Sequence, residues 1–253
     1  MKQLISFDIK ADFGFLKKPD TNEPMYLTFN MIHKPFVLGL LGAILGERGF
    51  QKNEVLPDYY LKLRDIPIGI TPLSDEDDFK GNFQKTVIKY NNGVGYASKE
   101  TGGNLIITEQ TLVKPSYRIY LLTDNQELIR RIQNYEAEFL PYLGKNDFSL
   151  WWENVQVYDY EKFEPDNNYQ VHSLFIKKMI IKEGKEVDDD IPAWEMNFTG
   201  GEFAYFERLP TGYDEELYQY EYQPFVLTTF KLKRDYKIDN LYQLNKDEII
   251  QVF

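Results

Sequence analysis

The chain has no cysteine and only two histidines, His33 and His172. Without cysteine there is no disulfide, no cysteine nucleophile, and no zinc or iron–sulfur site built on thiolates. Two histidines also disfavour a multi-histidine metal site. The carboxylate runs at 75–78 and 188–190 carry a charge that suits Mg²⁺, but we expect both to be solvated loops. The sequence therefore predicts no metal and no cofactor.

A long hydrophobic run is also missing. The longest apolar stretch, Phe36–Gly46, has 11 residues, whereas a membrane helix needs about 20. Of the 253 residues, 43% are hydrophobic and 27% are charged, which is ordinary for a folded soluble protein. An aromatic content of 16% argues against disorder. We expect a cytoplasmic protein that does not bind a membrane.

An excess of positive charge is absent as well, since the net charge is −11. Residues 1–150 hold 18 Lys and Arg against 19 Asp and Glu, whereas residues 151–253 hold 11 against 21. Phosphates are repelled by acidic surfaces, so the chain as a whole is a poor non-specific nucleic-acid binder. A local basic face is expected only in the first part. The acidic second part should face solvent or a basic partner.

The first 158 residues contain four strand-like segments and two helix-like ones. Alternation of apolar and polar residues predicts a strand with one buried face at 3–11. The other predicted strands are 59–66, 116–123 and 148–158. Pro35 opens the apolar run, as proline does in a first helical turn. A second helix is predicted from Asp124 as cap with Glu127 three residues on, and with an apolar face formed by Leu128, Ile132, Tyr135 and Phe139.

This order, strand, helix, strand, strand, helix, strand, is that of a ferredoxin-like α+β fold. Two further β-like segments, 84–90 and 104–113, interrupt it between the middle strands. They predict a long hairpin insertion with a Gly-rich tip. Beyond residue 160 we expect strands at 171–182, 203–209 and 224–233. We therefore divide the chain into residues 1–158 and an acidic β-rich part, 159–253, and leave open whether both belong to one domain.

Three segments resemble the Cas5 family of type I CRISPR complexes. Residues 13–46 (FGFLKKPDTNEPMYLTFNMIHKPFVLGLLGAILG) are similar to its N-terminal signature, an aromatic–glycine turn with basic residues followed by Pro and a Gly-rich helix. Residues 111–122 (TLVKPSYRIYLL) and 143–148 (LGKNDF) fit its middle section. The resemblance covers about residues 3–158, and its overall character is most like type I-B.

The resemblance implies a fold and a role. Members have an RNA-recognition-like (RAMP) domain with a protruding thumb hairpin, for which residues 80–113 are the candidate. They cap one end of the surveillance complex called Cascade and hold the 5′ handle of the crRNA in antiviral defence. They contact a Cas7-type backbone subunit and a Cas8-type large subunit, and reach target DNA only through the complex, where guide pairing reads the sequence.

The candidate RNA-binding residues are cations and aromatics in these segments. Cations neutralise phosphates and aromatics stack on bases. The set is Lys17, Lys18, Lys34, Arg48, Lys114, Tyr117, Arg118 and Lys145. For each a plain structural role stays open, such as a solvated loop, a helix-end charge, or a core position for Tyr117. Gly39, Gly42 and Gly46 are expected to permit close packing on a sheet or a partner chain.

A catalytic role is a weaker prediction. The type I-C subgroup of the family cuts precursor RNA with a Tyr/Lys/His set in which Lys and His are adjacent. This chain has no Lys-His pair, because Lys114 is followed by Pro115. His33 remains as a lone candidate base. We expect a non-catalytic subunit; the alternatives are a metal-independent endoribonuclease that processes crRNA, or a ferredoxin-like protein-interaction module without an RNA role.

Overall fold

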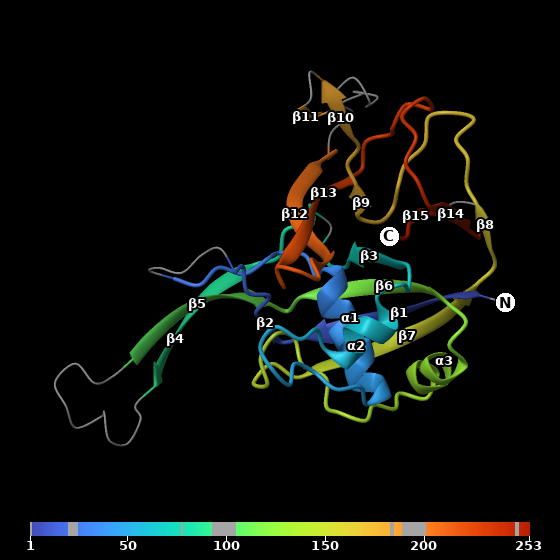
Figure 1. Ribbon diagram of the computed structural model, residues 1–253. Coiled ribbons are helices and arrows are strands. Elements are labelled where there is room, and N and C mark those ends of the chain that lie inside the picture. Colours follow the sequence, from blue (N-terminus) through green and yellow to red (C-terminus); the bar gives the residue numbers. More distant parts are fainter. Residues whose placement is uncertain are drawn as a thin grey trace.

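The computed structural model describes residues 2–19, 25–76, 78–92, 105–182, 185–188, 201–245 and 248–253. Within these ranges the chain is a mixed α/β protein with few helices and several antiparallel sheets (Figure 1). None of the described helices is both long and apolar enough to cross a membrane.

The central sheet has four strands in the order β3-β6-β1-β7. They are β1 (Gln3–Ala11), β3 (Ile68–Pro72), β6 (Ser116–Thr123) and β7 (Leu150–Tyr158). β1 lies between two neighbours and is buried on both faces rather than one: Ser6 and Asp8 are buried although they were expected to face solvent. Polar partners make this possible, because Ser6 shares a hydrogen bond with Tyr158 (3.0 Å) and Asp8 pairs with Arg118.

Helix α1 (Lys34–Leu45) packs on this sheet in Figure 1 and begins as the sequence predicted. His33 caps its first turn, Pro35 occupies that turn, and Gly46 ends the helix in the left-handed conformation at φ 82°. Seven of its residues are buried, which explains the apolar run.

Two other helices correct the predictions. Residues 59–66 are not a strand: α2 (Asp58–Leu63) occupies them, and β3 starts only at Ile68. Tyr60 and Leu63 are its buried residues, a spacing of three that fits a helix better than a strand. Helix α3 (Gln126–Gln133) is capped by Asn125, whose Oδ1 accepts from the Leu128 N–H at 3.0 Å, and not by Asp124.

Because α3 ends at Gln133, the predicted helical face does not continue. Tyr135, at a positive φ of 58°, and Phe139 lie in the loop that follows. That loop is hydrogen-bonded to the end of α1 through Glu138 N to Ile44 O (3.2 Å) and Phe139 N to Ala43 O (3.0 Å).

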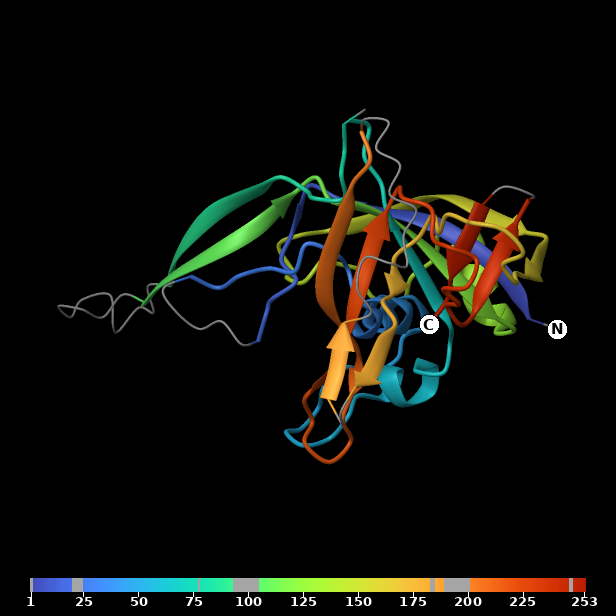
Figure 2. The ribbon, with the colours of Figure 1, turned by 90° about the horizontal axis from the view of Figure 1, so that it is seen from above.

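A long hairpin projects from the body (Figures 1 and 2). Its strands are β4 (Lys85–Asn92) and β5 (Leu105–Val113), and the short β2 (Phe13–Gly14) pairs with β5 at its base. These bounds match the predicted insertion closely. The predicted Gly-rich tip is 91–103: Asn91 and Asn92 belong to β4, and residues 93–103 lie outside the described residues.

The second part of the chain is largely β. The predicted strands 171–182, 203–209 and 224–233 overlap β9, β10, β12 and β13, with different ends. The strands are β8 (Tyr160–Lys162), β9 (Phe175–Ile176), β10 (Met179–Lys182), β11 (Lys185–Asp188), β12 (Ala204–Tyr213), β13 (Tyr220–Thr228), β14 (Leu241–Leu244) and β15 (Glu248–Gln251). Leu209 and Phe225 belong to the same hydrophobic core as Ile5 and Leu38, so the two parts fold against each other.

Candidate nucleic-acid interface

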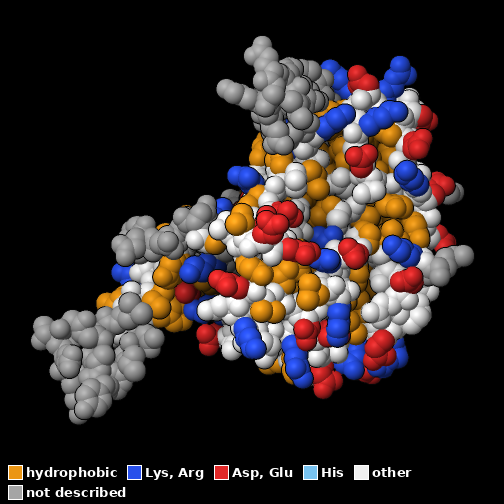
Figure 3. All heavy atoms as spheres, viewed as in Figure 1, with side chains coloured by type: hydrophobic (Ala, Val, Ile, Leu, Met, Phe, Trp, Pro, Cys, Tyr) orange, Lys and Arg blue, Asp and Glu red, His pale blue; other side chains and the backbone are white. Residues whose placement is uncertain are grey.

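The base of the hairpin brings several predicted residues together. The backbone of Tyr26 lies along β5, donating to Thr108 O (2.9 Å) and accepting from Gln110 N (2.9 Å). Lys17 is exposed, and its Nζ stands 3.9 Å from the centre of the Tyr26 ring. The ammonium is held over the ring as a cation–π pair, and an exposed cation of this kind attracts phosphate. Figure 3 shows Lys and Arg side chains beside apolar ones where the hairpin leaves the body.

Lys145 connects the 143–148 loop to the hairpin. Its Nζ lies 2.8 Å from the Glu109 carboxylate and 3.8 Å from the centre of the Tyr90 ring. Glu109 is buried, so the ion pair is partly shielded from solvent. Lys145 therefore acts first as a brace that fixes the hairpin to the body, and its charge is already balanced.

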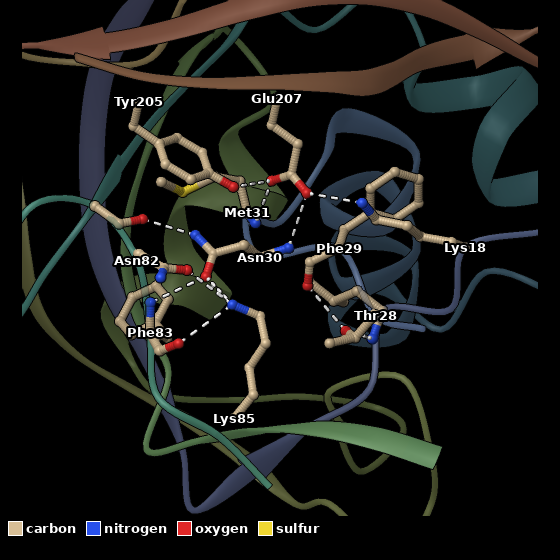
Figure 4. A network of polar contacts seen from close by, with 12 residues as sticks. Lys18, Thr28, Phe29, Asn30, Met31, Asn82, Phe83, Lys85, Tyr205 and Glu207 are labelled. Carbon is tan, nitrogen blue, oxygen red and sulfur yellow. Dashed lines mark hydrogen bonds and ion pairs between the residues drawn. The ribbon is translucent and has the colours of Figure 1, made fainter. Parts of the chain in front are cut away.

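Lys18 belongs to a second polar network, shown in Figure 4. Its Nζ lies 3.4 Å from a Glu207 carboxylate oxygen on β12, and that carboxylate is almost fully buried. Glu207 also accepts from the backbone N–H groups of Asn30 (3.0 Å) and Met31 (2.9 Å). The network joins the second part of the chain to the segment that enters α1.

Three further predicted cations are scattered. Lys34 is half-buried and donates to the Phe253 carbonyl at 2.9 Å; its burial lowers its pKa. Arg48 is exposed just past the end of α1. Lys114 is exposed at the turn between β5 and β6, at a positive φ of 48°. Of these, Lys114 is at the hairpin base.

Tyr117 and Arg118 lie on β6 and have structural partners. Tyr117 is fully buried, and its hydroxyl donates to the Asn30 carbonyl at 2.6 Å; burial raises its pKa well above the usual value. Arg118 makes a two-pronged contact with Asp8, at 2.7 and 2.9 Å. Of the two roles considered for Tyr117, the structure shows the core position. Its buried ring therefore offers no face to a base.

Sequence reasoning missed one face of the hairpin. Lys85, Val87 and Lys89 alternate along β4, and side chains two apart share a face. Ile106 on β5 lies on the same face, because it pairs with Asn91 of β4. Val87 and Ile106 are both exposed. Lys85 donates to Asn30 Oδ1 at 2.9 Å, and its burial lowers its pKa. The two lysines of KTVIK, which lie four residues apart and therefore on one face of a strand, were the signal in the sequence.

The glycines of α1 face α2. A Cβ added to Gly42 would lie 2.4 Å from the Tyr59 Cβ, and one added to Gly39 would lie 3.7 Å from the Tyr59 ring. Gly46 provides the left-handed helix end. Close packing within the chain accounts for Gly42, and the predicted packing of these glycines on a partner stays a prediction.

Carboxylates do not gather into a metal site in the described part of the chain, where no three Asp, Glu or His side chains are suitably placed. Of the two acidic runs considered above, Asp77, Asp189 and Asp190 lie outside the described residues.

Comparisons with known proteins give a structural likeness. No family model matches the sequence, and no curated protein matches it. A chain of a CRISPR RNA-guided surveillance complex superposes with a TM-score of 0.50 and 11% identity, over 90% of this chain and 91% of that one. The two chains share a fold.

Two other solved structures are similar at slightly lower scores. A CRISPR protein from Archaeoglobus fulgidus matches 99% of this chain and 100% of its own, with a TM-score of 0.49 and 11% identity. A chain of the Type III-B Cmr-beta complex bound to cognate target RNA matches 92% of this chain and 87% of its own, with a TM-score of 0.49 and 13% identity.

His33, the candidate base, is a buried helix cap. Its Nδ1 accepts from the Phe36 N–H at 3.4 Å, and the rings of Phe29 and Tyr220 stand 5.3 and 5.5 Å from its own. Desolvation by this burial lowers the pKa of His33 from 6.5 to about 3. The imidazole is neutral at physiological pH and is enclosed by aromatic rings.

This environment predicts a pH dependence of stability. Between about pH 6.5 and pH 3 the unfolded chain binds a proton at His33 and the folded chain does not, so stability falls as the pH falls, by about 1.4 kcal/mol per pH unit. In His33→Asn, which keeps a cap-forming side chain, this contribution is absent. Urea unfolding of both proteins across this range should show that the free energy of unfolding falls less for the variant than for the wild type as the pH falls. A constant difference would mean that His33 is protonated in the folded protein.

Proposed function

We propose that the chain is a Cas5-like subunit of a type I CRISPR surveillance complex, most like type I-B, that binds the 5′ handle of crRNA. In this role it caps the Cas7-type backbone, contacts the Cas8-type large subunit, and meets target DNA only through the complex. The sequence resemblance and the fold shared with a chain of a CRISPR RNA-guided surveillance complex support the proposal. The observation that carries it is the placement of Lys17 and Tyr26 beside the hairpin.

The arrangement of the central sheet supports a ferredoxin-like core within this proposal. β1 connects through α1 to β3, and β6 connects through α3 to β7. In the order β3-β6-β1-β7 each of these connections skips one strand, as in the split β-α-β units of that fold. The hairpin β4–β5 enters between β3 and β6, and we assign it as the thumb.

The surface chemistry at the hairpin base suits the backbone of a single-stranded RNA. Lys17 and Lys114 are exposed, and Lys89 extends the positive charge along the hairpin beside exposed Val87. Lysines attract phosphates without reading sequence, and aromatic or apolar faces accept unstacked bases. A handle of fixed sequence bound in this way would be recognised mainly through its shape.

We propose that the subunit does not cut RNA. General-base catalysis requires His33 to reach a 2′-hydroxyl and to gain its proton near neutral pH. Burial of the imidazole and the lowered pKa both oppose this. An endoribonuclease that uses His33 would first have to open the aromatic enclosure.

RNA binding by purified protein tests the proposal. We expect tight, salt-sensitive binding of 5′-labelled repeat RNA with EDTA present, and intact RNA on a denaturing gel. Lys17→Gln should weaken binding by about three- to tenfold and reduce the slope of log affinity against log salt by about 0.7, because one phosphate contact is lost.

The matched control is Lys162→Gln, an exposed lysine on β8, far from the hairpin in Figure 1. It should bind as the wild type does. Equal losses in both variants would assign binding to general charge rather than to the hairpin base. A discrete cut that disappears in His33→Ala would instead support the endoribonuclease. Absence of binding, both alone and with the Cas7-type subunit, would contradict the proposed function.

A further inference from the structure

A pocket of about 570 Å³ lies beside α1, and Lys17, the proposed RNA contact, lines one part of it. Its walls are mainly apolar and aromatic, and come from α1 (Phe36, Leu40), the segment after it (Phe50), the loop after α3 (Leu140), and the ends of β12 and β13 (Tyr213, Tyr220). A concave apolar site with a few polar groups is the usual form of a binding site.

Large apolar side chains around this pocket are exposed to solvent. Leu140 is 75% exposed and Phe50 58%. Leu217, in the turn that joins the two pocket tyrosines, is 65% exposed. On the face shown in Figure 3, apolar side chains gather near the middle of the body with charged side chains of both signs around them. Apolar surface that is gathered in one place on a folded protein marks an interaction site.

The turn between Tyr213 and Tyr220 carries an excess of negative charge. It has the sequence DEELYQ and is followed by Glu221, so it holds four carboxylates and no cation of its own. Glu215 pairs with Arg64 on the neighbouring α2 segment. In the loop that carries Leu140, Glu136 and Glu138 are already paired with Arg130 and Arg131. Carboxylates repel phosphates, so the 214–221 turn favours a protein ligand over RNA.

Both loops are held in place before anything binds. The Asp214 carboxylate accepts from the N–H groups of Glu216 (2.8 Å) and Leu217 (2.7 Å). The other loop is hydrogen-bonded to the end of α1, as described above. Loops that are already ordered lose little entropy when a partner docks.

We propose that this pocket is the docking site for a basic segment of a partner protein, which inserts a large apolar side chain between α1 and the Tyr213–Tyr220 pair. Lys or Arg residues of that segment then meet the carboxylates of Glu216 and Glu221 in the 214–221 turn. The inference rests on the proposed function for its choice of partner, which is the Cas7-type or Cas8-type subunit of the same complex.

Assembly of the complex with charged variants tests this docking. Leu140→Asp and Leu217→Asp place a carboxylate in the apolar contact while leaving the core untouched. Co-purification from cells that also produce the Cas7-type and Cas8-type subunits should show at least about a tenfold loss of one of these proteins. Binding of repeat RNA by the Leu217→Asp chain alone should stay within about twofold of the wild type. Val157→Asp, at a 56% exposed apolar position on β7, is the control and should assemble normally.

The segment itself is identified by placing a photo-crosslinking benzoylphenylalanine at position 140 of the assembled complex. The crosslinked peptide should contain a large apolar residue with Lys or Arg close by, and an acidic peptide or a crosslink to RNA would overturn the proposal. Full assembly of both Asp variants would also overturn it and leave the proposed function standing. A wild-type chain that joins neither the subunits nor RNA would refute both.

Discussion

Glu207→Ala should destabilise the protein by about 3–5 kcal/mol, because its carboxylate is an almost fully buried partner for several groups at once. Removing it leaves the N–H groups of Asn30 and Met31 without their acceptor, and each unpaired buried group costs about 1–3 kcal/mol. The Tyr205 hydroxyl, which donates to Glu207 at 3.0 Å, and Lys18 lose their partner too. In thermal unfolding we expect the midpoint to fall by roughly 10 °C.

The control for this prediction is Glu216→Ala, an exposed carboxylate in the turn after β12. It should change the free energy of unfolding by no more than about 0.5 kcal/mol. Glu207→Gln should lie between the two, because it keeps one acceptor oxygen and the side-chain shape. If Glu207→Ala unfolded like the wild type, water or another side chain would have to replace the carboxylate, and the network in Figure 4 would be incidental to stability.

The network also explains how the two parts of the chain act as one unit. The backbone N–H of Asn30 donates to Glu207. Its side-chain oxygen accepts from the Phe83 N–H (2.9 Å) and from Lys85 at the start of the hairpin. β12, the entry to α1 and the hairpin therefore meet at one residue. A change in β12 that weakened this junction should also loosen the hairpin, although the two lie far apart in sequence.

Much of the fold follows from periodicity. The strand at 116–123 and the Pro-opened apolar run of α1 were predicted correctly, because both segments are rich in apolar residues and both are largely buried. The segment 59–66 was misread because YYLKL alternates as a strand does. Its buried pair, Tyr60 and Leu63, is spaced for a helix, and only the packing of α1 against Tyr59 shows which pattern applies.

The candidate site was less predictable for a physical reason. A sequence shows where cations are, but not which carboxylates face them. Lys145, Lys18 and Arg118 all meet partners that lie far away in sequence, namely Glu109, Glu207 and Asp8. Among the described residues, the side chain of Lys17 meets the Tyr26 ring and no carboxylate. Cations that pair with a carboxylate of the fold stabilise the structure, whereas an exposed cation without such a partner can bind a ligand. The sequence alone does not distinguish the two groups.

The glycines of α1 give the second large effect, because two chemically identical substitutions should have opposite signs. Gly42→Ala places a Cβ 2.4 Å from the Cβ of Tyr59, so either α1 or α2 must shift. Overpacking of this kind costs about 1–3 kcal/mol and occasionally more. Because the obstructing atom is itself next to the backbone, a rotamer change of Tyr59 cannot relieve it.

Gly39→Ala is the matched case one turn earlier on the same helix. Its Cβ would stand 3.7 Å from the Tyr59 ring, which is ordinary contact, so the gain in helix propensity of about 0.5–1 kcal/mol should prevail. In denaturant unfolding, the midpoint should therefore be higher for Gly39→Ala and lower for Gly42→Ala than for the wild type. Two stabilised variants would mean that α1 and α2 separate easily. Two destabilised variants would mean that the face of α1 at Gly39 also packs more tightly than the structure shows. Opposite signs would establish that the close packing of α2 on α1 requires glycine at position 42. Tyr59, which makes this contact, also lines the pocket beside α1.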